Sequence, residues 1–124
     1  MNKREVIEFF DRCAPGWDAG TIRDDEKIGF ILDMAGIKPG ISVLDVACGT
    51  GVLFPDYLAR GVSRVTGVDI SPEMAHIAVT KLRDPRVEVL CGDVETIALS
   101  AGTIVAWYTM LFLILKTLPA LWHA

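Results

Sequence analysis

The sequence has 124 residues, 52% of them hydrophobic and 23% charged, so it suits one packed domain and is not typical of a disordered chain. Its formal net charge of −4 at pH 7 disfavours nucleic acid or an anionic membrane as a partner, because both attract clustered Lys and Arg. Cys13, Cys48 and Cys91 form no metal-binding motif, so no metal site is expected. The N-terminal stretch MNKREVIEFFDRC lacks the apolar core of a signal peptide, which favours a cytoplasmic protein.

The first expected element is a helix over Asp24–Ala35. Its apolar residues recur at intervals of three and four, and acids occupy its first turn. The β-branched run Ile41–Val46 predicts a buried strand. A short helix is expected over Pro55–Arg60, because proline fits a first helical turn and Gly61 is typical of a helix C-terminus.

The same alternation continues along the chain. Arg64–Ile70 predicts a second strand, Ser71 is the N-cap of a third helix that ends near Leu82, and Val87–Cys91 predicts a third strand. Strands that alternate with helices indicate a parallel sheet with right-handed crossovers. We therefore expect an α/β fold with a Rossmann-like parallel sheet.

An aspartate stands at or just after the end of each predicted strand: Asp45, Asp69 and Asp93. Parallel strands end at one edge of the sheet, where ligands bind in open α/β folds, and neighbouring strands lie about 5 Å apart. The three carboxylates are therefore expected to border one elongated site. Gly49 and Gly51 let the backbone turn tightly beside a ligand, with the N–H groups of the next helix behind them.

The charge of Asp45 restricts the ligand that this turn can bind. A carboxylate there would repel a pyrophosphate and attract a ligand that carries an ammonium and a sulfonium. Asp69, about 20 residues after the turn, is placed to accept hydrogen bonds from two ribose hydroxyls. A nicotinamide dinucleotide site is the weaker alternative, because its fingerprint needs a third glycine where the chain has Phe54.

The segments LDVACGTG, VTGVDIS and VEVLCGD resemble the first three motifs of class I S-adenosylmethionine-dependent methyltransferases. Ala47 stands where the first motif of that family usually has glycine. The resemblance covers about Phe9 to Ile97 and implies a partial class I methyltransferase fold. It also implies S-adenosyl-L-methionine as cofactor and methyl transfer to an unidentified small-molecule acceptor, with no nucleic acid partner.

The resemblance further implies roles for individual residues. Asp45 and the loop from Ala47 to Gly51 would hold the methionine part of the cofactor, Asp69 the ribose hydroxyls, and Asp93, with the Val94 N–H, the adenine. The segment FFDRCAPGWD is similar to the lead-in of small-molecule members, where a helix ahead of the sheet helps to cover the cofactor. The cofactor-binding residues expected on this basis are Trp17, Asp45, Ala47, Cys48, Gly49, Thr50, Gly51, Asp69, Ile70, Met74, Asp93 and Val94.

Several of these residues also have purely structural interpretations. Asp69 can be an acid that leads a helix, and Asp93 can belong to an ordinary Gly-Asp turn. Cys48 is expected to be a small buried residue and not a nucleophile, because no histidine lies near it in the sequence. Trp17 can cover the cofactor or fill a hydrophobic gap.

The last 25 residues differ in composition from the rest of the chain. Of 28 charged residues, 27 lie in residues 1–99 and only Lys116 lies in residues 100–124. We therefore divide the chain at residue 99. The resemblance implies that residues 1–99 are the N-terminal part of an S-adenosylmethionine-binding methyltransferase domain, and residues 100–124 form an atypical apolar tail.

Three interpretations of the tail remain open. It can be a membrane anchor, which Lys116 and the lack of a flanking basic cluster disfavour, or a fourth strand merged with a buried helix. It can also be the product of a reading-frame shift near residues 97–102, since codon degeneracy permits an alternative peptide that resembles the family's continuation. In that case the acceptor-binding part is missing, and the chain is a catalytically inactive fragment that self-associates through exposed apolar surface.

Overall fold

The computed structural model describes residues 2–93, 96 and 103–105. Its elements, in chain order, are α1 Lys3–Cys13, the 3-10 helix η1 Ala14–Gly16, α2 Trp17–Gly20, α3 Asp25–Met34, β1 Ser42–Val46, α4 Phe54–Ala59, β2 Arg64–Asp69, α5 Pro72–Lys81, β3 Val87–Cys91 and β4 Thr103–Val105.

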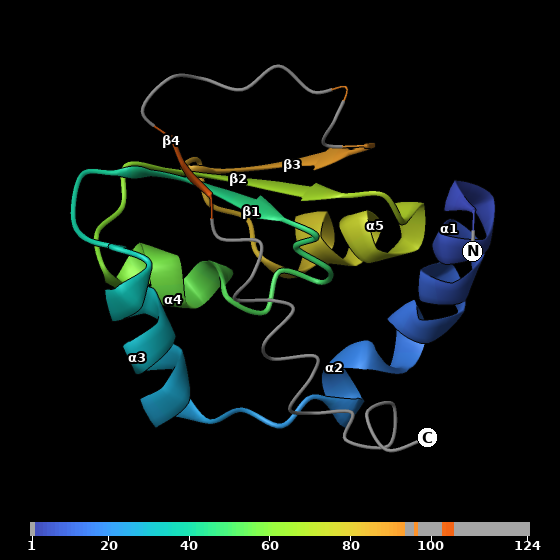
Figure 1. Ribbon diagram of the computed structural model, residues 1–124, viewed down its shortest axis with the longest axis horizontal. Coiled ribbons are helices and arrows are strands. Elements are labelled where there is room, and N and C mark those ends of the chain that lie inside the picture. Colours follow the sequence, from blue (N-terminus) through green and yellow to red (C-terminus); the bar gives the residue numbers. More distant parts are fainter. Residues whose placement is uncertain (1, 94–95, 97–102, 106–124) are drawn as a thin grey trace.

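The four strands form one parallel sheet in the order β3-β2-β1-β4 (Figure 1). The chain moves from β1 to β2 to β3 in one direction across the sheet, so right-handed crossovers put both connecting helices, α4 and α5, on the same face. Figure 1 shows them below the sheet, with β2 and β3 pointing toward the side where α1 lies. The predicted α/β fold with a Rossmann-like parallel sheet is confirmed.

The helix caps follow the sequence signals. Asp24 accepts from the Lys27 N–H at 3.1 Å and begins α3, and Ser71 accepts from the Met74 N–H at 3.2 Å and begins α5. Helix α1 was not among the elements expected from periodicity. Its apolar residues Val6, Phe10 and Cys13 do recur at helical spacing, so this periodic signal was present in the sequence although the helix buries no residue completely.

Part of the tail belongs to the sheet. Thr103–Val105 forms β4, which pairs with β1 so that Ile104 lies opposite Val43. These three residues agree with the fourth-strand interpretation, and the remainder of the tail lies outside the described residues. Within residues 2–93, no helix is long and apolar enough to cross a membrane.

Phe54 fixes the turn between β1 and α4 to the sheet. Its ring is fully buried and occupies the space that a side chain at Gly51 or Gly67 would need, since a Cβ there would stand 2.7 Å or 2.5 Å from ring atoms. Gly51 also has φ +76°, which favours glycine. Phe54 therefore fills the position at which a dinucleotide fingerprint requires a third glycine.

Asp45 places a carboxyl group in the core. Its side chain is 1% exposed, and its Oδ1 atom has no hydrogen-bond partner among the described residues. Burial raises the pKa of Asp45 to about 7, the nearby Tyr57 side chain opposes that rise, and the charge of Asp69 adds to it. The ionised form of Asp45 therefore costs folding free energy near neutral pH.

Gly67→Ala is expected to destabilise the fold. The new methyl group would stand 2.5 Å from Phe54 Cζ and 2.9 Å from Cys48 Sγ, and both side chains are fully buried. Overpacking of this kind costs about 1–3 kcal/mol, so the urea midpoint should fall. Gly20→Ala is the matched control, because nothing lies within 4 Å of a Cβ at that position. An equal loss in both variants would contradict the packing argument.

Asp45→Asn is expected to stabilise the protein at high pH. Because the folded-state pKa lies above the unfolded value, the folded state binds more protons between about pH 4 and pH 7, and stability falls as pH rises through that window. The loss reaches at most about 4 kcal/mol above pH 7, and asparagine avoids it because it is uncharged and close to aspartate in size.

Urea unfolding of both proteins at pH 5 and pH 8 measures this effect. The advantage of the variant should be larger at pH 8 than at pH 5, with Asp69 and Cys48, the other titratable groups that face Asp45, present in both proteins. The same difference at both pH values would show that ionisation of Asp45 does not set the stability.

Candidate functional site

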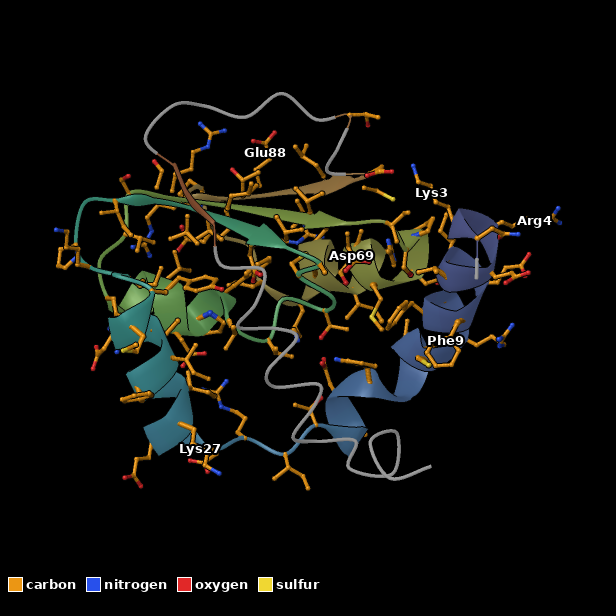
Figure 2. The ribbon with its side chains drawn as sticks, in the orientation of Figure 1. Lys3, Arg4, Phe9, Lys27, Asp69 and Glu88 are labelled. Atoms are coloured by element: carbon orange, nitrogen blue, oxygen red, sulfur yellow. The ribbon has the colours of Figure 1, made fainter. Side chains whose placement is uncertain are left out.

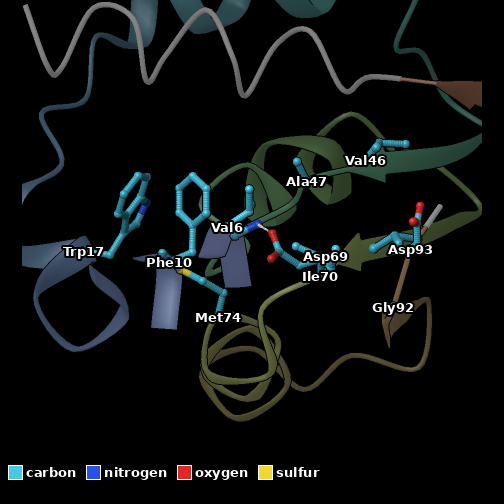
Figure 3. Close-up of a pocket in the computed structure, with 12 residues that line it drawn as sticks. Val6, Phe10, Trp17, Val46, Ala47, Asp69, Ile70, Met74, Gly92 and Asp93 are labelled. Carbon is cyan, nitrogen blue, oxygen red and sulfur yellow. Dashed lines mark hydrogen bonds between the residues drawn. The ribbon is translucent and has the colours of Figure 1, made fainter. Parts of the chain in front are cut away.

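A cavity of about 220 Å³ lies at the C-terminal ends of β1, β2 and β3 (Figure 3). The N-terminal helices form one wall and the loops after the strands form the other. The lining is apolar apart from two aspartates, and consists of Val6, Phe10, Trp17, Val46, Ala47, Gly49, Val68, Asp69, Ile70, Met74, Gly92 and Asp93. Pockets for drug-sized ligands usually measure roughly 300–1,000 Å³, so the described residues enclose part of such a ligand.

Asp69 stands at the end of β2, near the middle of this lining (Figures 2 and 3). Its Oδ2 atom accepts from the Gly49 N–H at 2.7 Å, and its Oδ1 atom accepts from the Ser71 N–H at 2.9 Å. Burial raises the pKa of Asp69, although these two bonds oppose the rise. A carboxylate offers roughly four acceptor positions, so each oxygen can accept one further hydrogen bond, such as one from a hydroxyl group.

The turn after β1 presents Ala47 and Gly49 to the cavity. Ala47 has φ +58°, a left-handed conformation that costs a residue with a Cβ about 1–2 kcal/mol. Helix α4 begins only at Phe54, and none of its residues is among the described lining. The expectation that its N–H groups lie behind the ligand stays a prediction.

Asp93 lies just after β3, at the end of the cavity far from Trp17 (Figure 3). It forms an ion pair with Lys3, which projects from α1 toward the end of β3 (Figure 2), and its side chain is 21% exposed. The ion pair fastens the start of α1 to the loop after β3.

Two aromatic rings form the N-terminal wall. The Phe10 ring contacts the Trp17 ring edge to face, with the ring centroids 6.2 Å apart and the planes at 65°. Figure 3 shows both rings on the side of Asp69 away from Asp93, with Met74 of α5 beside them. The structure thus places Trp17 in the wall of the cavity.

Two acids tie this wall to the sheet. Asp11 accepts from the Ser71 hydroxyl at 2.5 Å, and Asp18 accepts from the Thr50 hydroxyl at 2.6 Å and from the Lys81 ammonium at 2.9 Å. Partial burial works against ionisation of Asp18, but the bonds from Thr50 and Lys81 hold its pKa below the ordinary value. The Thr50 hydroxyl is therefore engaged away from the cavity.

Most of the expected site residues come together. The lining includes Trp17, Ala47, Gly49, Asp69, Ile70, Met74 and Asp93. Val94 lies outside the described residues, and Asp45, Cys48, Thr50 and Gly51 are not part of the lining. The expected site residues did not include Val6, Phe10, Val46, Val68 and Gly92, although Phe10 belongs to the FFDRCAPGWD segment that was expected to cover the cofactor.

The expectation that three carboxylates border the site is wrong for Asp45. Side chains alternate between the faces of a strand, and β1 turns Asp45 toward Tyr57 of α4 while Val46 meets the cavity. Of the three predicted carboxylates, Asp69 and Asp93 are among the described lining residues.

Cys48 is confirmed as a buried residue. It is 0% exposed, and burial raises the pKa of its thiol far above the ordinary value, so a nucleophilic thiolate does not form. Cys13, Cys48 and Cys91 are all free cysteines in the structure.

A family model described as a methyltransferase domain matches residues 43–122 of the chain. The matched range contains the glycine turn, β2, β3 and β4, and it extends over most of the tail. The division of the chain at residue 99 stays a prediction, and so does the origin of the tail in a reading-frame shift.

Two curated relatives are methyltransferases. Malonyl-[acyl-carrier protein] O-methyltransferase of Serratia marcescens is 33% identical over 99 residues, which cover 80% of this chain and 38% of that protein. Demethylmenaquinone methyltransferase of Renibacterium salmoninarum is 34% identical over 102 residues, covering 75% and 41%. The chain thus spans well under half the length of these relatives.

Solved structures give the same result. A SAM dependent methyltransferase from Aquifex aeolicus is 32% identical with a TM-score of 0.50, covering 58% of this chain and 41% of that chain. The 23S rRNA methyltransferase ErmE is 29% identical with a TM-score of 0.57, covering 65% and 33%. Because the family model matches more than half of this chain, the chain belongs to the methyltransferase domain family, of the class I S-adenosylmethionine-dependent type.

Proposed function

We propose that the chain is the cofactor-binding part of an enzyme that transfers a methyl group from S-adenosylmethionine to a small-molecule acceptor. The observation that carries the proposal is the cavity at the strand ends, where Asp69 and Asp93 are the two charged side chains among described lining residues that are otherwise apolar. An apolar slot suits a purine ring, and a carboxylate with remaining acceptor capacity suits the two hydroxyls of a ribose.

The lining residues divide along the length of such a ligand. Asp69 would accept the ribose hydroxyls, Ile70 and Asp93 would contact the adenine, and the backbone at Ala47 and Gly49 would adjoin the methionine part. S-adenosylmethionine supplies a methyl group on a positively charged sulfur. The work of this chain is to orient that group and exclude water, with Trp17 and Met74 closing the cavity.

The charge of the cavity favours a cationic ligand. Two carboxylates line it, of which Asp93 is paired with Lys3 of α1, and no lysine or arginine is among the described lining residues. A pyrophosphate is normally bound by cationic side chains or helix N–H groups, and α4 presents none to this cavity. A nicotinamide dinucleotide is therefore disfavoured.

The nature of the acceptor rests on the relatives. The name of the Renibacterium relative points to a quinone-type small molecule, whereas ErmE modifies 23S rRNA. The net charge of −4 supports a small molecule over nucleic acid, because RNA is bound mainly through basic side chains. A cytoplasmic location and self-association through the tail, residues 100–124, are part of the same proposal.

Asp69→Ala is expected to weaken S-adenosylmethionine binding at least tenfold, because hydrogen bonds to a charged group contribute about 1.5–3 kcal/mol each. Isothermal titration calorimetry with S-adenosylmethionine and S-adenosylhomocysteine measures the effect. Asp33→Ala is the matched control, since Asp33 is an exposed acid of α3 whose partner, Arg60, lies outside the cavity lining. The absence of heat from the wild-type chain at millimolar ligand would overturn the proposal.

The alternative is a fragment that binds the cofactor without turnover. Binding that depends on Asp69, together with no transfer of a labelled methyl group to any offered quinone or acyl acceptor, would identify that case.

A further inference from the structure

The N-terminal segment contains two aromatic–acid pairs, Phe10-Asp11 and Trp17-Asp18, which lie seven residues apart. In each pair the aromatic residue lines the cavity, and the acid that follows it bonds to a loop at the end of a strand. The same arrangement thus occurs at the end of α1 and at the start of α2.

Asp11 binds the loop after β2. One carboxylate oxygen accepts both the Ser71 hydroxyl at 2.5 Å and the Glu73 N–H at 3.2 Å. Because these groups belong to the first turn of α5, the negative charge of Asp11 also lies at the positive end of that helix. Ser71 is fully buried, so its hydroxyl is shielded from water, whereas the bond from the Glu73 N–H is exposed.

Asp18 binds the loop after β1. Its Oδ1 atom accepts from the fully buried Thr50 hydroxyl at 2.6 Å, and its Oδ2 atom accepts from the Lys81 ammonium at 2.9 Å. Lys81 also approaches Thr50, at 3.3 Å, so α2, the glycine turn and the end of α5 meet at one polar cluster.

The contacts follow the order of the strands. Lys3 pairs with Asp93 after β3, Asp11 bonds after β2, and Asp18 bonds after β1. The segment 3–20 therefore contacts the loops after three neighbouring strands, and its helix α1 lies on the side toward which β2 and β3 point (Figure 1).

Apolar packing of this segment is weak. Helices α1 and α2 bury no residue completely, η1 buries only Ala14, and Phe9 is 38% exposed (Figure 2). The polar contacts at the strand ends therefore contribute much of the free energy that holds Phe10 and Trp17 in place.

We propose that Asp11 and Asp18 are positioning residues that clamp Phe10 and Trp17 over the cavity and set how fast a bound ligand leaves. The identity of that ligand, a nucleoside bearing a sulfonium, rests on the proposed function, whereas the clamp itself does not. Loosening either acid frees the adjacent ring, opens the N-terminal wall and speeds dissociation.

The clamp is tested first without ligand, by hydrogen exchange of the full chain. Asp18→Ala and Asp11→Ala should each lower the protection of residues 3–20 about tenfold while the amides of β1, β2 and β3 keep theirs. Asp25→Ala is the matched control, because Asp25 is an exposed acid of α3 whose ion pair with Arg23 lies outside the clamp.

Thr50→Val provides an independent variant. It removes the hydroxyl partner of Asp18 with little change of shape, and should reproduce the loss of protection. In the double variant with Asp18→Ala the two effects should not add, because both remove the same contact. This variant keeps the test decisive if Asp11→Ala does not fold.

The second arm measures dissociation of S-adenosylhomocysteine by stopped-flow displacement. Dissociation should be about tenfold faster in Asp18→Ala and unchanged in Asp25→Ala. Unchanged exchange of residues 3–20 in Asp18→Ala and Thr50→Val would overturn the clamp, and so would an equal change in the Asp25 control. Altered exchange in a protein that binds neither ligand would uphold the clamp and overturn the proposed function.

Discussion

The hydrogen bond from the Gly49 N–H to the Asp69 carboxylate holds together the two loops that form the cavity. Asp69 ends β2, and through this bond it fixes the turn that follows β1, while its second oxygen fixes the start of α5 through the Ser71 N–H. One side chain thus sets the spacing of two loops that are 20 residues apart. The structural and functional interpretations of Asp69 are compatible, because two acceptor positions remain after the backbone is satisfied.

The parts of the fold that depend on local signals were predictable from sequence. Ser71 and Asp24 cap helices because their side chains accept backbone N–H bonds within three residues, and the apolar runs of β1 and β2 identify buried strands. The face on which each strand residue lies was not predictable. Both faces of β1 are buried, so the sequence VLDV does not indicate that Asp45 turns toward Tyr57 and not toward the cavity.

The N-terminal wall depends on contacts between distant parts of the chain. Thr50 lies 32 residues after Asp18, and Ser71 lies 60 residues after Asp11. No periodicity within α1 or α2 contains this information, because the partners are single hydroxyl groups in turns. Because Phe10 and Asp11 are adjacent in the sequence, as are Trp17 and Asp18, the two side chains of each pair point in different directions. The partners of each side chain become known only when the fold places the strand ends beside this segment.

Because Asp45 is buried, its negative charge can influence the charge of a bound ligand only at a distance and not by direct contact. A carboxylate that touches the ligand acts through a direct bond, whereas Asp45 acts through the low dielectric of the core, where charges interact over longer distances than in water. Near neutral pH its pKa of about 7 leaves the unliganded protein divided between the neutral and ionised forms. A cation in the adjacent cavity would favour the ionised form and offset part of its desolvation cost, and an anion would add to that cost. On the proposed function, Asp45 would therefore add to the preference of the two lining carboxylates for a cationic ligand.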